Sequence, residues 1–313
     1  MRLLCYIHTL VIDLSRQSVN SYHMWRKMIS SENGRGLLMV SPPFLYALIM
    51  MAVPLAAIFM FSFWTQNFMD VDTTFTLNNY RKIIEEPIYA ALLKRSLFVS
   101  GSVTLVTVLL AFPVAYFVSF HVRPDRKSLW LFLITIPFWT SYLIRVFLWK
   151  VILGYNGVIN TGLMNLGIID EPLTFILYNV NAVIITLAHA FAPFAILPIF
   201  VALEKIDRSL LEASQDLGES KFMTFIRVTL PLSMPGLVGA VLIVFIPTIG
   251  DYVTPELMGG AGGKLIANMI QTQFLALNNA PLGAALAIVA MLSVTAISLI
   301  FVLLNRRWLK GRS

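Results

Sequence analysis

The chain has 313 residues, of which 58% are apolar and 12% are charged, about half the charged share of an ordinary soluble domain. The single Cys5 cannot form an internal disulfide, and no Cys/His cluster has the spacing of a metal site, which argues against disulfide-stabilised and metal-dependent classes. The net charge of +7 lies in short segments between apolar runs, a distribution that argues against nucleic-acid binding.

Residues 1–36 precede the first long apolar run. Their own apolar stretch, Leu3–Leu14, is too short and too polar to span a membrane, and no small-residue cleavage site follows it. We therefore expect a cytoplasmic N-terminal segment, partly disordered, or an upstream extension if translation starts at Met24 or Met28.

Six apolar runs follow along the chain. A helix rises about 1.5 Å per residue and the hydrocarbon core is about 30 Å thick, so about 20 apolar residues cross it once. The runs are Leu37–Phe63, Leu97–Phe120, Leu129–Leu153, Val180–Leu203, Leu232–Val253 and Leu282–Leu304. They predict an all-α membrane protein with six transmembrane helices in one domain over residues 37–304, lying in the lipid bilayer.

The positive charges alternate between the connections. Sixteen Lys and Arg residues lie before Gly36, in His121–Ser128, in Glu204–Pro231 and after Leu304, and the other connections hold five. Because positive loops stay on the cytoplasmic side, both termini are predicted to be cytoplasmic, including a basic tail at residues 305–313.

The longest cytoplasmic connection, residues 204–231, is predicted to be structured. Ser209 and Glu212 have the spacing of a capping box that starts a helix. Gly218 stands where a left-handed turn would end that helix. A second short helix is predicted to follow and to end before Pro231. One narrow face of the first helix is formed by Leu210, Ala213, Ser214 and Leu217.

The same loop carries a longer spacing pattern. Glu212–Ser214, three residues, Gly218, nine residues and Val228–Pro231 resemble the EAA motif of the permeases of binding-protein-dependent ABC importers. Ser214 replaces the second alanine of the motif, and Val228 replaces an isoleucine. The alternative reading is an ordered loop on the membrane surface. The resemblance implies a type I ABC importer permease with a cytoplasmic coupling helix that docks on a dimer of ATPase subunits. The coupling residues would be Leu210, Glu212, Ala213, Ser214, Gly218 and Pro231.

The chain itself is not expected to hydrolyse ATP. Its nearest approach to a phosphate-binding loop is Gly259–Lys264, but Met258 and Leu265 stand where a glycine and a Ser/Thr are required. We therefore predict no catalytic residue and no bound cofactor or metal, with ATP and Mg²⁺ used by the partner ATPase. The glycines are predicted to form a flexible external loop.

Two further stretches, Pro137–Arg145 and Gly250–Gly260, resemble the spermidine/putrescine branch of these permeases. Permeases for ferric iron and opine-type compounds share parts of them, so those substrates stay open. The resemblance implies an inner-membrane subunit that forms half of a pathway for a small cation. It also implies a periplasmic substrate-binding protein and a second, distinct permease subunit as partners.

The ionisable residues in or near the spans are Arg145, Lys150, His189 and Asp251. Each needs a reason because a charge in lipid is costly. Arg145 and Lys150 are interpreted as interfacial anchors or as partners of a carboxylate, the alternative being a substrate role. His189 is interpreted as a hydrogen-bonding residue between helices.

Asp251 follows Pro247 and Gly250, which can open a helix toward a cavity. A carboxylate beside aromatic rings suits an alkylammonium ion. The candidate substrate path therefore consists of Trp139, Tyr142, Asp251 and Tyr252, and a solvated loop carboxylate is the alternative for Asp251.

Two other classes of membrane protein fit the sequence less well. A proton-coupled secondary transporter would be expected to show acids near the midplane and often an internal repeat, and neither is evident. A membrane-embedded enzyme would need paired acids or a nucleophile with a base, and the sequence has no such set.

Overall fold

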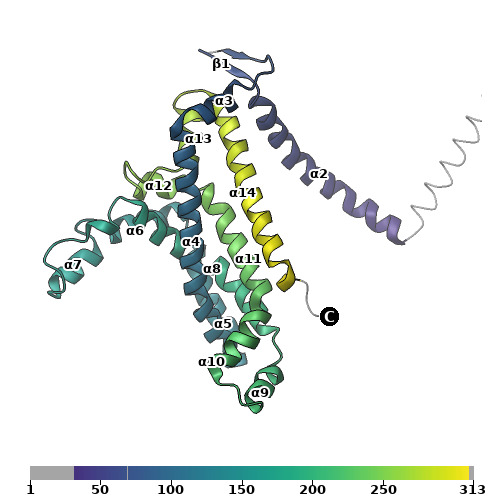
Figure 1. Ribbon diagram of the computed structural model, residues 1–313, viewed down its shortest axis with the longest axis vertical. Coiled ribbons are helices and arrows are strands. Elements are labelled where there is room, and N and C mark those ends of the chain that lie inside the picture. Colours follow the sequence, from purple (N-terminus) through teal and green to yellow (C-terminus); the bar gives the residue numbers. More distant parts are fainter. Residues whose placement is uncertain (1–31, 69, 310–313) are drawn as a thin grey trace, which may run out of the picture. The chain divides into compact units, whose positions relative to one another are not determined.

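The structure, a computed structural model, describes residues 32–68 and 70–309 (Figure 1). The predictions for residues 1–31 and for the end of the basic tail, residues 310–313, lie outside these ranges. Contacts divide the chain into two units that meet between Met60 and Phe61. All of α2 (Glu32–Phe61) except its last residue belongs to the first unit, and its part from Arg35 is long and apolar enough to cross a membrane.

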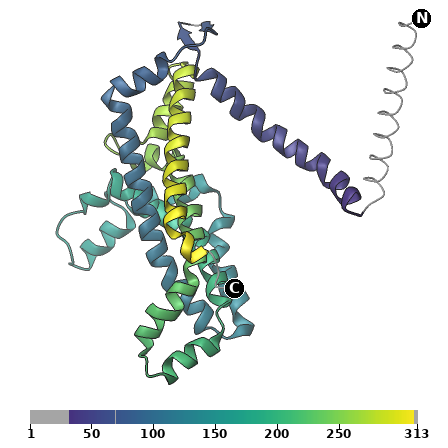
Figure 2. The ribbon, with the colours of Figure 1, turned by 45° about the vertical axis from the view of Figure 1, so that its right-hand side comes forward.

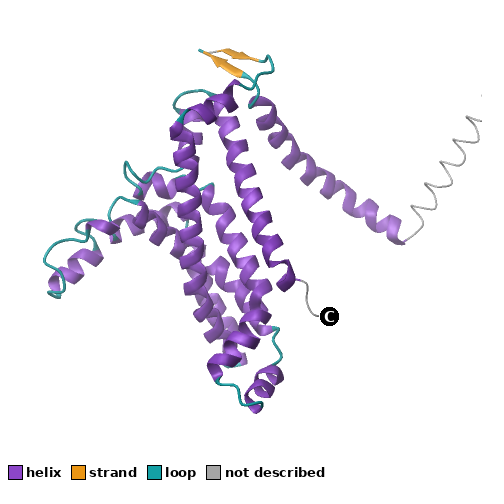
Figure 3. Ribbon diagram, viewed as in Figure 1, coloured by secondary structure: helices purple, strands orange, loops and turns teal. Residues whose placement is uncertain are grey.

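The second unit is a helical bundle with a small hairpin at one end (Figure 1, Figure 3). Its long helices are α4 (Pro87–Phe120), α8 (Val180–Glu204), α11 (Leu230–Ile249) and α14 (Ala280–Leu309). The shorter helices are α3 (Asn78–Glu85), α5 (Pro124–Thr135), α6 (Tyr142–Ile152), α7 (Val158–Asn165), α9 (Arg208–Asp216), α10 (Lys221–Thr224), α12 (Val253–Met258) and α13 (Ile266–Leu275). Three tighter or wider turns are η1 (Ile136–Trp139), η2 (Thr174–Ile176) and the π-helical η3 (Phe225–Thr229).

The core of the bundle lies where α8 packs between α4 and α11. Small and β-branched side chains line these contacts, as is usual where membrane helices approach closely. Gly236 on α11 is required at one crossing, because an added Cβ would lie 2.4 Å from the Cβ of Ala202 on α8. The buried residues of this core include Val99, Val103, Ala111, Val118, Val183, Leu187, Ile199, Leu203, Ala240 and Val244.

The predicted spans are confirmed with one change. Five helices in the described part of the chain are long and apolar enough to span, and a sixth span exists if α5–η1 and α6 are counted together. These two segments meet at 87°, so the prediction of a continuous helix over Leu129–Leu153 is wrong. Thr140 and Ser141 have extended backbone at the break. Figure 2 shows α6 and α7 projecting sideways from the bundle.

The two ends of the bundle differ. One end carries an antiparallel hairpin, β1 (Thr65–Asn67) and β2 (Asp70–Asp72), with Thr65 opposite Asp72. Asn79 of α3 holds the segment that leads into this hairpin, since its amide donates to the carbonyl oxygens of Ser62 at 3.0 Å and Trp64 at 2.8 Å. The other end carries α9 and α10 (Figure 1). The sequence predicted the second of these features but not the hairpin.

Candidate functional site

The chain leaves the bundle after α8, forms α9 and returns through α10 to α11; this segment, residues 204–231, is here called the docking loop. Helix α9 starts at Arg208, and Asp207 is its N-cap because its carboxylate accepts the backbone N–H of Ser209 at 3.0 Å. This hydrogen bond lowers the pKa of Asp207. Ser209 is therefore inside the helix, and the predicted capping box of Ser209 with Glu212 is wrong. Asp207 caps the helix instead, two residues before the predicted N-cap Ser209.

The end of α9 confirms the predicted left-handed turn. Gly218 has φ of +88°. Its N–H bonds to the carbonyl of Gln215 at 2.9 Å, and the N–H of Glu219 bonds to the carbonyl of Ser214 at 3.2 Å. These two bonds form a complete Schellman motif, which satisfies carbonyls that the helix end would otherwise leave unpaired.

The faces of α9 have different environments. Leu211 packs on the core of the bundle. On the outer side, Leu210 is 47% exposed and Leu217 is 86% exposed, and Ala213 is also exposed. Ser214, predicted on that face, instead pairs its hydroxyl with Thr224 of α10 at 3.1 Å. An apolar face exposed in this way is typical of a surface that binds another protein.

The returning segment does not end before Pro231, so that prediction is wrong. α10, η3 and α11 form one continuous helix from Lys221 to Ile249. Pro231 lies in the first turn of α11, and the preceding π-turn pairs the N–H of Leu230 with the carbonyl of Phe225. A proline has no N–H to donate to the residue four positions earlier, and the wider π-turn lies where that bond is missing.

A polar network that the sequence did not reveal holds the base of the docking loop. The guanidinium of Arg208 lies 3.9 Å from the centroid of the Phe120 ring and donates to the carbonyl of Ser119 at 2.9 Å. Lys127 of α5 pairs with Glu204 of α8 at 2.6 Å, and the hydroxyl of Ser119 reaches the same carboxylate at 3.1 Å. The start of the loop is therefore fixed to α4, α5 and α8.

The predicted substrate-path residues meet only in part. The hydroxyls of Tyr142 on α6 and Thr254 on α12 are 2.7 Å apart, and Tyr142 also interacts with Asp251. The carboxylate of Asp251 accepts the backbone N–H groups of Val253 at 3.2 Å and Thr254 at 3.3 Å, so it caps the start of α12. Tyr142 and Asp251 are therefore brought together from distant parts of the chain.

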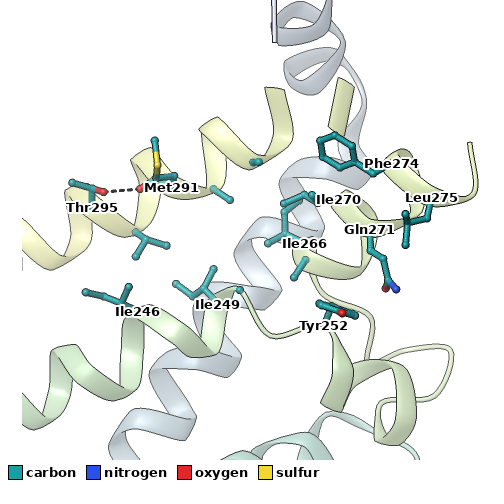
Figure 4. Close-up of a pocket in the computed structure, with 15 residues that line it drawn as sticks. Ile246, Ile249, Tyr252, Ile266, Ile270, Gln271, Phe274, Leu275, Met291 and Thr295 are labelled. Atoms are coloured by element: carbon teal, nitrogen blue, oxygen red, sulfur yellow. Dashed lines mark hydrogen bonds between the residues drawn. The ribbon is translucent and has the colours of Figure 1, made fainter. Parts of the chain in front are cut away.

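The other two candidates lie elsewhere. Trp139 is 79% exposed, and the centroid of its ring lies 6.5 Å from that of Phe132. Tyr252 lines a cavity of about 580 Å³ between α11, α13 and α14 (Figure 4). Apart from Tyr252, its polar lining side chains are Gln271 and Thr295, and no carboxylate lines it. An apolar cavity of this kind does not suit a polycation, which needs paired charges when desolvated.

The remaining intramembrane residues have structural contacts. His189 of α8 accepts a hydrogen bond from the indole N–H of Trp149 on α6 at 3.1 Å, as predicted for a residue between helices. The ammonium of Lys150 lies near the rings of Phe147 and Tyr178. Arg145 is buried and bonds to backbone carbonyls, so it is neither an exposed anchor nor a partner of a described carboxylate.

The glycine-rich segment packs closely instead of forming an open loop. Gly260 has φ of +60°, and an added Cβ would lie 2.4 Å from the carbonyl oxygen of Tyr178. Arg95 of α4 donates to the carbonyl of Gly262 at 2.7 Å. Across residues 32–68 and 70–309, no group of three or more His, Cys, Asp or Glu residues is arranged to hold a metal.

Apolar helices long enough to span a membrane, packed around a common core and with an exposed helical loop at one end, define a multispan membrane protein. The chain belongs to the family described as binding-protein-dependent transport system inner membrane component, whose family model matches residues 87–310. It is therefore a permease subunit of an ABC importer, as the motifs of the sequence predict.

Curated relatives share most of the chain. The spermidine/putrescine transport system permease protein PotB of Haemophilus influenzae is 42% identical over 238 residues, which cover 74% of this chain and 82% of that protein. PotB of Escherichia coli K12 is 41% identical over 218 residues, covering 70% and 78%.

Among solved structures, a bacterial ABC transporter for the import of the acidic polysaccharide alginate matches with a TM-score of 0.70 and 17% identity. It covers 91% of this chain and 99% of its own. This match supports the fold.

Proposed function

We propose that this chain forms half of the translocation pathway of an importer for small polyamines such as spermidine or putrescine. The observation that carries the proposal is the sequence identity to PotB permeases, 42% over 238 aligned residues and 41% over 218. Tyr142 and Asp251, which meet beside α12, offer a carboxylate and an aromatic ring to an alkylammonium ion.

A separate ATPase would drive this transport through the docking loop. The exposed Leu210, Ala213 and Leu217 present an apolar face of one rigid helix, which is fixed at both ends. A helix of this kind suits a groove on a partner protein. The sequence 258–265 lacks the glycine and the hydroxyl of a phosphate-binding loop, which supports a non-catalytic role for this chain.

We further propose that the docking loop faces the cytoplasm and that a second, related permease and a periplasmic binding protein complete the importer. The partition of sixteen against five basic residues supports this orientation. Reporter fusions at Asn156 and Lys264 should report periplasm, and a fusion after Arg312 should report cytoplasm. A cytoplasmic signal from Asn156 or Lys264 would contradict the topology.

Transport is tested by reconstituting the permease pair with the ATPase and the binding protein in liposomes. We expect ATP-dependent uptake of labelled spermidine or putrescine that disappears when the ATPase carries an inactivating substitution. Uptake of a ferric complex or an opine instead would retain the importer and replace the substrate. Uptake driven by a proton gradient without ATP would contradict the importer itself.

A further inference from the structure

Arg145 is a buried arginine inside a broken membrane-spanning segment. It is only 7% exposed. Among the residues that the structure describes, no carboxylate lies within ion-pair distance of its guanidinium. Because burying a charge is costly, the contacts that Arg145 does make need an explanation.

The guanidinium bridges three elements. One terminal nitrogen donates to the carbonyl of Thr140 at 3.2 Å, and the other donates to the carbonyl of Ala190 on α8 at 3.3 Å. Its central carbon lies 5.5 Å from the centroid of the Phe138 ring in η1. Arg145 therefore joins the segment before the break, the break itself and the neighbouring long helix.

The bond to Thr140 has a local reason. Thr140 follows η1 and has extended backbone, with φ of −86° and ψ of 149°. A carbonyl at such a helix end has no partner in its own helix, and a cation is the favoured group to satisfy it. Arg145 lies one turn into α6 and turns back to this carbonyl, so it stabilises the bent arrangement and would find no such partner in a straight helix.

The direction of α6 decides where Tyr142 lies. Tyr142 is the first residue of α6, and its hydroxyl meets that of Thr254 at 2.7 Å beside Asp251. A rotation of α6 about the break would move this hydroxyl away from α12. Arg145 thus affects the position of Tyr142 through the direction of α6, because its hydrogen bonds are to Thr140 and Ala190.

We propose that Arg145 is a positioning residue: by bridging Thr140 and Ala190 it holds the bend between α5 and α6 and places Tyr142 against the Asp251–Thr254 turn. The effect on transport rests on the proposed function, whereas the effect on geometry does not. Lysine cannot replace arginine in this role. Its ammonium is a point charge, and the planar guanidinium reaches two carbonyls in fixed directions while it lies near a ring.

A cross-linking experiment tests the geometry. Because Cys5 is the only cysteine in the sequence, Cys5→Ser gives a cysteine-free chain to which Tyr142→Cys and Thr254→Cys are added. A short bifunctional thiol reagent then reports whether the two positions face each other in the assembled complex. Three versions are compared: Arg145 unchanged, Arg145→Lys and Arg145→Gln. Lys150→Gln is the matched control, since it removes from the same helix a cation whose ammonium lies over the rings of Phe147 and Tyr178.

We expect the cross-link yield to fall on the order of fivefold in both Arg145 variants and to stay unchanged in Lys150→Gln. With Tyr142 and Thr254 restored, the maximal rate of uptake should fall on the order of tenfold in both Arg145 variants. The concentration of loaded binding protein at half-maximal rate should stay within about twofold. The protein level in the membrane should not change.

Full cross-linking and a normal rate in Arg145→Lys would overturn the proposal, because charge alone would then suffice. Normal cross-linking in Arg145→Gln would overturn it as well. If Arg145→Gln does not accumulate in the membrane, Arg145→Lys supplies the test. If the complex transports no polyamine at all while the cross-link depends on Arg145, the proposed substrate fails and the positioning role stands.

Discussion

Replacing Gly218 by valine tests whether the docking loop transmits the action of an ATPase. Gly218 has φ of +88°, and an added Cβ would meet no atom within 4 Å. The substitution therefore introduces no steric clash with neighbours, and its cost comes from the left-handed backbone alone. That cost is about 1–2 kcal/mol for a residue with a side chain, more for a β-branched one than for asparagine.

An energy of this size changes the population of the native turn by roughly five- to thirtyfold. If the Schellman turn rearranges, the bonds of Gly218 to Gln215 and of Glu219 to Ser214 are lost, and the direction of the chain from α9 to α10 changes. The exposed Leu210 and Leu217 would then no longer face one partner together. We expect Gly218→Val to weaken co-purification with the ATPase subunit and to reduce the ATP hydrolysis that the loaded binding protein stimulates.

Gly167 offers a matched control. It follows α7 with φ of +66°, and an added Cβ there also meets no atom within 4 Å. Its N–H bonds to Met164, and the N–H of Ile168 bonds to Leu163, so α7 ends in the same motif as α9. Gly167→Val carries the same local strain at a site remote from the docking loop. The reasoning is refuted if Gly218→Val assembles and is stimulated normally, or if both variants lose ATPase binding equally.

Three other variants test separate parts of the structure. Glu212→Ala should change the free energy of unfolding by no more than about 0.5 kcal/mol, because Glu212 is exposed and Asp207 is the residue that caps α9. It should nevertheless reduce co-purification with the ATPase, and unchanged co-purification would remove Glu212 from the interface. Asp251→Asn should lower polyamine uptake at a normal protein level, since asparagine keeps the cap of α12 and removes the charge; normal uptake would make Asp251 a structural cap. Gly236→Ala should lower the free energy of unfolding by about 1–3 kcal/mol, because its Cβ overlaps that of Ala202. Less protein should then be extracted from the membrane, and it should lose its structure at a lower temperature. Gly239→Ala on the same helix meets no atom within 4 Å and should cost nothing, and equal losses in both would contradict the packing argument.

Local sequence determined much of this protein. Runs of about 20 apolar residues predicted the spans, because the thickness of the bilayer sets the length of a helix that crosses it. Gly218 predicted the left-handed turn, since the conformation of one residue depends mainly on its own side chain. The spacing from Glu212 to Pro231 predicted the family, which the comparison confirms.

Local sequence was less reliable where two choices of similar energy compete. Asp207 and Ser209 are both good N-caps, and the pattern of Ser209 with Glu212 favoured the wrong one. The apolar run Leu129–Leu153 reads as one helix, yet the chain breaks at Thr140, whose carbonyl accepts a hydrogen bond from Arg145, and Arg145 is in turn bonded to the carbonyl of Ala190 on α8. Composition alone does not contain those contacts.

Only the tertiary structure decided which distant residues meet. Tyr142 and Thr254 are 112 positions apart, and Arg145 bonds to a carbonyl 45 positions away. Periodicity describes one helix at a time, whereas such pairs depend on how α6, α8 and α12 pack together. The sequence therefore determined the spans, the turn and the class of transporter. The packing of the helices decided the bend, the meeting of Tyr142 with Thr254 and the exposure of Trp139, because those depend on contacts between elements that no local pattern encodes.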